Sequence, residues 1–389
     1  MCHSGYTVIR TVEQVGWRDI PPIEEPRFWT ALSCGLHSSV LEPRARKAAL
    51  RRMAITFPEK PVVVITGASA GVGRAVARRF AQDGARIGLV ARGVEGLEGA
   101  RREVEALGGE ALIYPCDVSE REELEAAATY FEEELGPLDI WINNAFAGVL
   151  APFMDTDPED FRRVTEVTYF GQVHGTRAAL KRMMPRNHGS IVLVGSALAY
   201  RGIPLQAAYC GAKHAVQGFQ DSVRSELIAA KSRVHLSMVQ LPGVNTPQFD
   251  WIRTTMPNKP RPASPPYQPE LAAEAIHFAA HHRRKEVVMG WPSLQAIWGE
   301  KFVSPLVDRY LAATGIDGQQ DEEPVSRSRR DNLYDPVPGD RGAHGRFDAI
   351  AHRRSPALWL TTHRARAALG MGAALLAGGV AWAAARRGR

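Results

Sequence analysis

The stretch that decides the fold is VVVITGASAGVGRAVARRF, residues 62–80. An apolar run, Val62 to Thr66, predicts a buried strand, and a glycine-rich turn leads from it into helical spacing that begins at Arg74. Glycine lets the backbone turn sharply and approach a pyrophosphate closely, while the free N–H groups of a helix N-terminus attract negative charge. The stretch therefore predicts the first β-α unit of a nucleotide-binding domain. The residues expected to hold the nucleotide are Gly67, Ser69, Gly71, Val72 and Gly73.

The same alternation of strand and helix continues to about residue 290. Because the apolar runs are continuous and alternate strictly with amphipathic stretches, they predict a parallel sheet covered by helices on both faces. We therefore expect a single Rossmann-like, doubly wound α/β domain with about seven strands, which binds ligands at the carboxyl ends of its strands. The predicted strands are Val62–Thr66, Arg86–Ala91, Ala111–Tyr114, Asp139–Asn143, Ile191–Gly195, Val234–Gln240 and Glu286–Met289, and the clearest predicted helices are Arg74–Gln82, Glu120–Leu135, Ala207–Ala230 and Glu270–His281.

Composition limits the class of protein. The 389 residues are 45% hydrophobic and 23% charged, which supplies a full core and excludes a wholly disordered chain. The four cysteines lie far apart without metal-ligand spacing, so we expect no disulfide framework, no bound metal and a cytoplasmic setting. The net charge of +6 comes from the two ends, whereas residues 53–312 are close to neutral. We therefore expect no nucleic-acid partner.

The N-terminal region differs from the rest of the chain. Residues 1–52 lack convincing periodicity, contain several prolines and end in a basic run. They predict an irregular N-terminal extension upstream of a true start at Met53, and a targeting segment is the alternative. The Rossmann-like domain is expected to follow as residues 53–316.

The C-terminal region divides into two parts. Residues 317–356 contain too few aliphatic side chains for a core and predict a polar linker or a strap lying on the domain. Residues 357–389 predict a C-terminal helix, in which 367–385 carries no charge and has arginines on both sides. That segment would be about 28 Å long, close to the hydrocarbon thickness of a bilayer, so we expect a membrane anchor. Its many Ala and Gly residues favour the alternative, a packed soluble helix.

Arg92 follows the second predicted strand, at the place where a site that binds NAD usually carries a carboxylate for the ribose 2′-hydroxyl. A guanidinium can instead form a charge-assisted pair with a 2′-phosphate. The residue therefore favours NADP over NAD as the cofactor. The alternative is an arginine that is merely exposed on the surface.

Three further residues form a candidate catalytic group. Ser196 ends the fifth predicted strand, and thirteen residues later a predicted helix carries Tyr209 and Lys213. Residues four apart lie side by side on a helix face. A phenol is a poor acid or base at neutral pH, but a neighbouring ammonium stabilises its phenolate and lowers its pKa. Tyr209 would then exchange a proton with a substrate oxygen while a nicotinamide exchanges hydride with the adjoining carbon.

Together these motifs resemble the short-chain dehydrogenase/reductase family of the TGxxxGxG and YxxxK type, over about residues 60–312. In that family the serine polarises the carbonyl, the tyrosine is the acid/base, and the lysine tunes the tyrosine and binds the nicotinamide ribose. The resemblance also implies a homo-oligomer. By the same resemblance, further cofactor-binding residues are Asp117, Asn144 in an NNAG-like segment where Phe146 replaces glycine, and Thr246 after the sixth strand.

One position departs from the family pattern. Many members carry an asparagine that completes a proton relay through water and the lysine, and this chain has Thr168 there. A hydroxyl can still bind water, so we expect a modified relay. The alternative is a purely structural threonine bonded within its helix.

The residues thus predict an NADP-dependent oxidoreductase that interconverts a carbonyl and a secondary alcohol. The apolar segment 247–267, where the family carries a substrate lid, favours a small hydrophobic substrate. We expect the enzyme on the cytoplasmic side, anchored by its C-terminal helix. Three alternatives stay open: a nucleotide-binding or sensing protein without turnover, an isomerase or dehydratase on the same fold, and a membrane scaffold.

Overall fold

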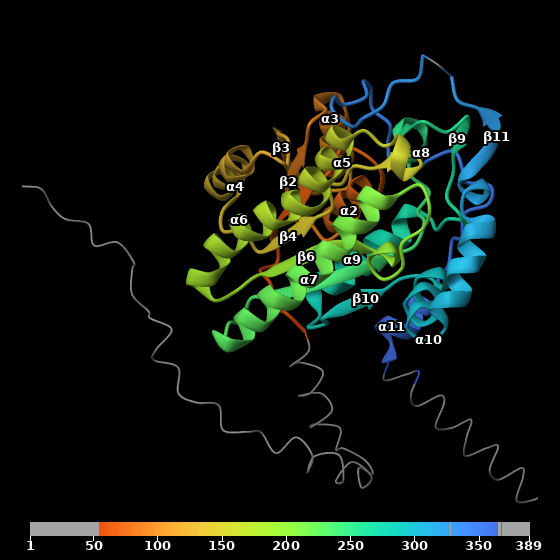
Figure 1. Ribbon diagram of the computed structural model, residues 1–389. Coiled ribbons are helices and arrows are strands. Elements are labelled where there is room, and N and C mark those ends of the chain that lie inside the picture. Colours follow the sequence, from red (N-terminus) through yellow and green to blue (C-terminus); the bar gives the residue numbers. More distant parts are fainter. Residues whose placement is uncertain (1–53, 327, 365–366, 368–389) are drawn as a thin grey trace, which may run out of the picture. The chain divides into compact units, whose positions relative to one another are not determined.

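A parallel seven-stranded sheet forms the centre of the computed structural model, which describes residues 54–326, 328–364 and 367 (Figure 1). The strand order is β3-β2-β1-β4-β6-β7-β10, and all neighbouring pairs are parallel. This confirms the doubly wound α/β prediction. The chain reverses its direction of travel across the sheet between β1 and β4, which places a ligand crevice there. The strands are β1 (Val62–Thr66), β2 (Arg86–Ala91), β3 (Glu110–Pro115), β4 (Ile140–Asn143), β6 (Ser190–Ser196), β7 (His235–Leu241) and β10 (Glu286–Val288).

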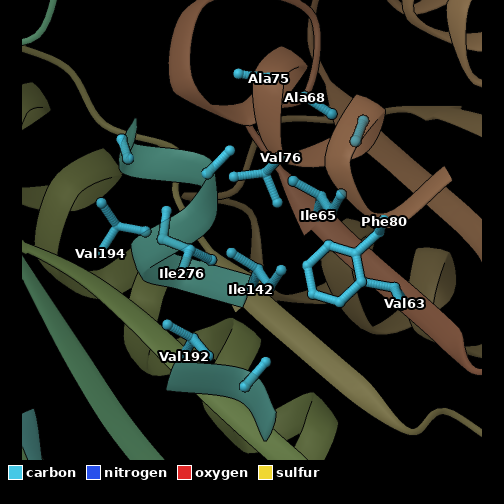
Figure 2. Close-up of a cluster of buried hydrophobic side chains, with 14 of the residues drawn as sticks. Val63, Ile65, Ala68, Ala75, Val76, Phe80, Ile142, Val192, Val194 and Ile276 are labelled. Atoms are coloured by element: carbon cyan, nitrogen blue, oxygen red, sulfur yellow. The ribbon is translucent and has the colours of Figure 1, made fainter. Parts of the chain in front are cut away.

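Helices cover both faces of this sheet, and each face has its own hydrophobic core. One face carries α2 (Gly71–Ala81), α3 (Val94–Ala106) and α9 (Pro269–His281). Figure 2 shows part of that core, where Val76 and Phe80 of α2 and Ile276 of α9 lie against β1, β4 and β6. The other core lies beneath α4 (Arg121–Leu135), α5 (Pro158–Thr165), α6 (Gly171–Arg186) and α7 (Ala207–Ala229).

Several shorter elements surround the carboxyl ends of the strands. β5 (Val149–Leu150) pairs with β8 (Arg253–Thr254), and β9 (Asn258–Pro260) pairs with β11 (Gln320–Pro324). The remaining elements are η2 (Phe153–Asp155), the π-helix η3 (Glu166–Phe170), η4 (Ala197–Ala199), α8 (Gln248–Trp251), α10 (Trp291–Thr314), η5 (Asp317–Gln319) and α11 (Pro356–Thr362). Helix α10 is kinked at Val303 because Pro305 cannot donate a backbone hydrogen bond.

The region between β11 and α11 lies on the domain as a strap. We call residues 328–355 the C-terminal strap; Figure 1 shows its blue trace passing close to α3 and α8. Its Leu333 side chain is fully buried in the core beneath α4 and α7, and Ala343 and Phe347 are also buried. These described residues therefore lie on the domain, and the predicted bounds of 317–356 for a linker or strap stay a prediction.

Two of the sequence-based predictions concern the ends of the chain. No helix among the described residues is long and apolar enough to cross a membrane. The predicted segment 367–385 lies outside the described residues, apart from Ala367. The finding on the described helices contradicts the prediction of a membrane anchor. Residues 1–52 also lie outside the described residues, so the division of the chain at Met53 stays a prediction.

Candidate active site

The glycine-rich loop joins β1 to α2 at the switch point of the sheet. Gly67 and Gly71 have φ angles of 68° and 57°, a region that favours glycine. A Cβ atom at Gly73 would lie 2.2 Å from the carbonyl oxygen of Gly67, so only glycine fits at this turn. Asn144 fixes the loop from β4, because its Nδ2 donates to the carbonyl oxygens of Thr66 and Gly67 at 3.0 and 3.2 Å. The loop thus brings its backbone to the crevice without intervening side chains at its glycines, which fits a diphosphate, and the Gly71 N–H there donates to the carbonyl oxygen of Gly342 at 3.0 Å.

A cleft of about 450 Å³ opens beside this loop, within the range of small-molecule sites. Most residues predicted to act in the site line it, although they come from segments far apart in the sequence. Two do not line it: Gly73, which lies beneath the loop, and Thr168. The predicted residues that line the cleft are Gly67, Ser69, Gly71, Val72, Arg92, Asp117, Asn144, Ser196, Tyr209, Lys213 and Thr246.

The three candidate catalytic side chains meet in this cleft. Ser196 is buried at the end of β6, where its hydroxyl accepts the N–H of Leu198 at 3.1 Å and lies close enough to the Tyr209 phenol to lower its pKa. Lys213 is fully buried one helical turn from Tyr209, and its Nζ lies 5.6 Å from the centre of the tyrosine ring. The same Nζ donates to the carbonyl oxygen of Val194 at 2.6 Å. The arrangement gives a substrate oxygen two hydroxyl partners beside one amine.

Electrostatics in this group differ from the sequence-based expectation. Burial raises the pKa of the Tyr209 phenol well above its usual value, and the nearby Ser196 hydroxyl offsets only part of that rise. Burial also lowers the pKa of Lys213 to about 7, so this amine is only partly charged at neutral pH. The expected lowering of the Tyr209 pKa by a full ammonium is therefore not found. The phenol instead stays protonated, which is the state that can donate a proton.

Thr168 lies away from the cleft, in η3. Its hydroxyl accepts the N–H of Ala147 at 3.0 Å and donates to the carbonyl oxygen of the same residue at 2.9 Å. The side chain is fully buried, and these two bonds hold the segment that follows β4. A place for Thr168 in a water relay stays a prediction; the observed bonds are structural, but they go to Ala147 and not within its own helix as the alternative expected.

On the side of the cleft predicted to hold adenosine, Asp117 and Arg92 already have hydrogen-bond partners that the sequence does not indicate. Asp117 pairs with Arg163 of α5 and accepts the Ser119 hydroxyl at 2.8 Å. Arg92 lines the cleft, and its guanidinium donates to backbone carbonyl oxygens of the C-terminal strap. Because these contacts occupy the groups that would bind a cofactor, the role of Asp117 and Arg92 in cofactor binding stays a prediction.

Sequence reasoning missed two arginines, one that bonds the strap to α2 and one that lines the cleft. Arg74 of α2 is 1% exposed, and its guanidinium donates to Asp340 of the strap at 3.1 and 3.2 Å. Arg341 lines the cleft from the strap. Local patterns predict neither residue, because the strap and α2 are more than 250 positions apart. The low number of aliphatic residues in 317–356 indicated that this segment forms no core of its own, but it did not indicate where the segment lies.

A sheet of this order, with a glycine loop at its switch point and a serine, tyrosine and lysine in the adjoining cleft, defines a class: the nicotinamide-dependent oxidoreductases. The profile described as short chain dehydrogenase matches residues 61–256. The uncharacterized oxidoreductase YxnA of Bacillus subtilis is 32% identical over 330 residues, which cover 84% of this chain and 91% of that protein. This chain belongs to the short-chain dehydrogenase family, and it is an NAD(P)-dependent oxidoreductase.

Two further similarities were found. A fatty acyl-CoA reductase of Acinetobacter baylyi is 28% identical over 258 residues, which cover 66% of this chain and 84% of that protein. The crystal structure of a metagenomic short-chain oxidoreductase in complex with NADP matches with a TM-score of 0.49 and 28% identity, covering 59% of this chain and 96% of that one. The homo-oligomer implied by the resemblance stays a prediction.

Proposed function

We propose that the protein is an NADP-dependent reductase of hydrophobic carbonyl compounds, with Tyr209 as the proton donor. The observation that carries this proposal is the meeting of Ser196, Tyr209 and Lys213 in the cleft beside the glycine loop. These residues come from β6 and α7, and no local sequence pattern requires them to share a site with a loop that follows β1.

The chain's own residues supply the proton chemistry. A bound nicotinamide supplies or accepts the hydride, and Gly71, Lys213 and Thr246 are the residues that would hold it and its phosphates. The Ser196 hydroxyl orients the carbonyl oxygen, and the Tyr209 phenol donates its proton to that oxygen. Lys213, when charged, stabilises the phenolate that remains. Because the Tyr209 phenol has a raised pKa, it is protonated at rest, which is the state needed to donate a proton to a carbonyl oxygen.

The cofactor assignment rests on basic groups at the cleft. The carboxylate that would select NAD is missing at the end of β2, where Arg92 stands. Arg92 and Arg341 both line the cleft and offer guanidinium groups suited to a phosphate. NADP carries one phosphate more than NAD, and it is therefore the cofactor that we propose.

The substrate class follows from the apolar side of the cleft. Part of the cleft is lined by aliphatic and aromatic side chains, which favour an apolar substrate. The similarity to a protein named fatty acyl-CoA reductase supports the same class. The apolar side chains that line this part are Phe146, Leu150, Leu198, Ile203, Phe249, Trp251 and Ile252.

Turnover with a series of carbonyl compounds tests this proposal. The purified protein is mixed with NADPH and straight-chain aldehydes and ketones of increasing length, and loss of nicotinamide absorbance is followed. We expect kcat/KM to rise with chain length, by about three- to fourfold for each buried methylene. Tight NADPH binding without turnover on any compound would support a sensing protein instead. Product formation without net change in absorbance would support an isomerase or a dehydratase.

A further inference from the structure

The C-terminal strap is bonded to the rim of the cofactor cleft along its whole length. At one contact, the Arg92 guanidinium donates to the carbonyl oxygens of Asn332, Leu333 and Tyr334, and the bond to Leu333 is 3.2 Å long. The Leu333 carbonyl also accepts from Arg163 at 3.1 Å. The strap is thus fastened to the residue that follows β2, on the side of the cleft predicted to hold adenosine.

A second contact fastens the strap to α2 and α3. The Asp340 carboxylate receives two bonds from the buried guanidinium of Arg74. Gly99 of α3 makes room for this pair, since a Cβ atom there would lie 1.9 Å from Asp340 Oδ2. A bidentate pair of this kind is among the stronger polar contacts in proteins.

A third group of contacts lies near the glycine loop and Thr246. The N–H of Gly71, at the start of α2, donates to the carbonyl oxygen of Gly342 at 3.0 Å. Beyond it, the N–H of Phe347 donates to Asn245 Oδ1 at 3.0 Å. Gly345 packs so closely that a Cβ atom would lie 2.3 Å from the carbonyl oxygen of Thr246. The strap therefore crosses the cleft from the end of β2 to the turn after β7.

The inner side of the strap forms a wall of the same cleft. One member of that wall is a cation: the Arg341 guanidinium donates to the carbonyl oxygen of Pro338, at 3.0 and 3.2 Å, and has no carboxylate partner among the described residues. Arg92, by contrast, already donates to three carbonyl oxygens. The strap residues that line the cleft are Asn332, Pro336, Val337, Gly339 and Arg341.

We propose that the C-terminal strap is the outer half of the cofactor site: it clasps the bound dinucleotide, and Arg341 contacts one of its phosphate groups. This inference rests on the proposed cofactor-dependent function. Cofactor would then leave only when the strap opens, which breaks the Arg74–Asp340 pair and the bonds from Arg92. The phosphate is either the 2′-phosphate or the diphosphate, and a comparison of NADPH with NADH separates the two.

The clasp is tested by loosening the strap away from the catalytic group. Gly99→Ala forces the Asp340 carboxylate away from Arg74, and Gly218→Ala on α7 is the matched control because its Cβ atom meets open space. The dissociation rate of NADPH is measured by stopped-flow fluorescence. We expect about a tenfold faster rate for Gly99→Ala and an unchanged rate for the control. If Gly99→Ala does not fold, Asp340→Ala replaces it, with the same expectation. An unchanged rate in the folded variant would overturn the clasp.

The role of Arg341 is tested by equilibrium titration. Arg341→Met is compared with Arg354→Met, a control at an exposed arginine outside the cleft. A roughly tenfold loss of affinity for NADPH alone assigns the 2′-phosphate, and an equal loss for NADPH and NADH assigns the diphosphate. Unchanged affinity for both removes Arg341 from the site and overturns that part of the inference. If the unmodified protein binds neither nucleotide, the proposed function fails and the clasp fails with it. If the unmodified protein binds them, and Gly99→Ala and Arg341→Met bind and release them in the same way, the clasp alone fails.

Discussion

Tyr209 is the residue on which the chemistry depends. Its phenol lies close enough to Ser196 for that hydroxyl to lower its pKa, and it is the proton donor that we propose. We expect Tyr209→Phe to lower kcat by about 10²- to 10⁴-fold, the usual contribution of a positioned acid, because the ring is kept and only the proton is lost. NADPH affinity, measured by fluorescence titration, should change by less than about twofold, since the loss is confined to chemistry. A variant that kept most of its kcat would show that the proton comes from elsewhere.

The Lys213 amine gives the reaction a characteristic pH dependence. Burial lowers its pKa to about 7, so it is charged below that pH and neutral above it. The charged form stabilises the phenolate left when Tyr209 donates its proton. We therefore expect kcat for carbonyl reduction to be constant at low pH and to fall about tenfold per unit as pH rises above about 7. In Lys213→Met the rate should be low and should lose this step. A step of the same size at the same pH in that variant would assign it to another group.

Single residues also show where sequence reasoning reached its limit. The glycine loop and the Ser196, Tyr209 and Lys213 group follow local patterns, and the structure brings them to one cleft. The bonds of Arg92 do not follow from any local pattern, because their acceptors lie about 240 positions away. Thr168 is similar: its partner Ala147 is 21 positions distant, and a resemblance to a motif says nothing about that bond.

At the scale of elements, the predicted strands agree with the observed ones to within one or two residues. The reason is that a parallel sheet buries both faces, so each strand is a continuous apolar run with clear ends. Helix α2 begins at Gly71, three residues before the predicted start, because the glycine-rich turn already contains its first turn. The two-residue strands β5 and β8 have no periodicity to detect, and they form because the lid segment folds back onto the loop after β4.

The packing of α2 against the sheet gives a stability prediction. Phe80 is 1% exposed and lies in the core that α2 shares with α9, whereas Phe153 is 65% exposed. Truncation of a buried phenylalanine leaves a cavity, so we expect Phe80→Ala to lower the free energy of unfolding by about 3–5 kcal/mol. Phe153→Ala is the matched control and should change it by less than about 1 kcal/mol. Urea unfolding followed by circular dichroism measures both. Similar losses in the two variants would contradict the packing described for α2.

At the scale of the whole molecule, the strap shows why a sheet can be predicted and a complete site cannot. The strap has almost no secondary structure, and what fixes it are side-chain bonds to α2, α3 and the ends of β2 and β7. Polar composition predicts that such a segment builds no core of its own. It does not predict that one leucine of the strap, Leu333, is buried in the core of the Rossmann-like domain.

The division of the molecule gives a final prediction. The described fold makes its first contacts at Ala54, which bridges to His282, and at Ile55, whose N–H donates to the carbonyl oxygen of His281 at 2.8 Å. Every residue of the candidate site comes later in the chain. We therefore expect a protein that begins at Met53 to keep the Tm and the NADPH affinity of the full chain, measured by calorimetry and titration. A protein that ends at residue 327 should lose both, because it lacks Leu333 and the partners of Arg74 and Arg92. A lower Tm on starting at Met53 would instead make residues 1–52 part of the folded unit.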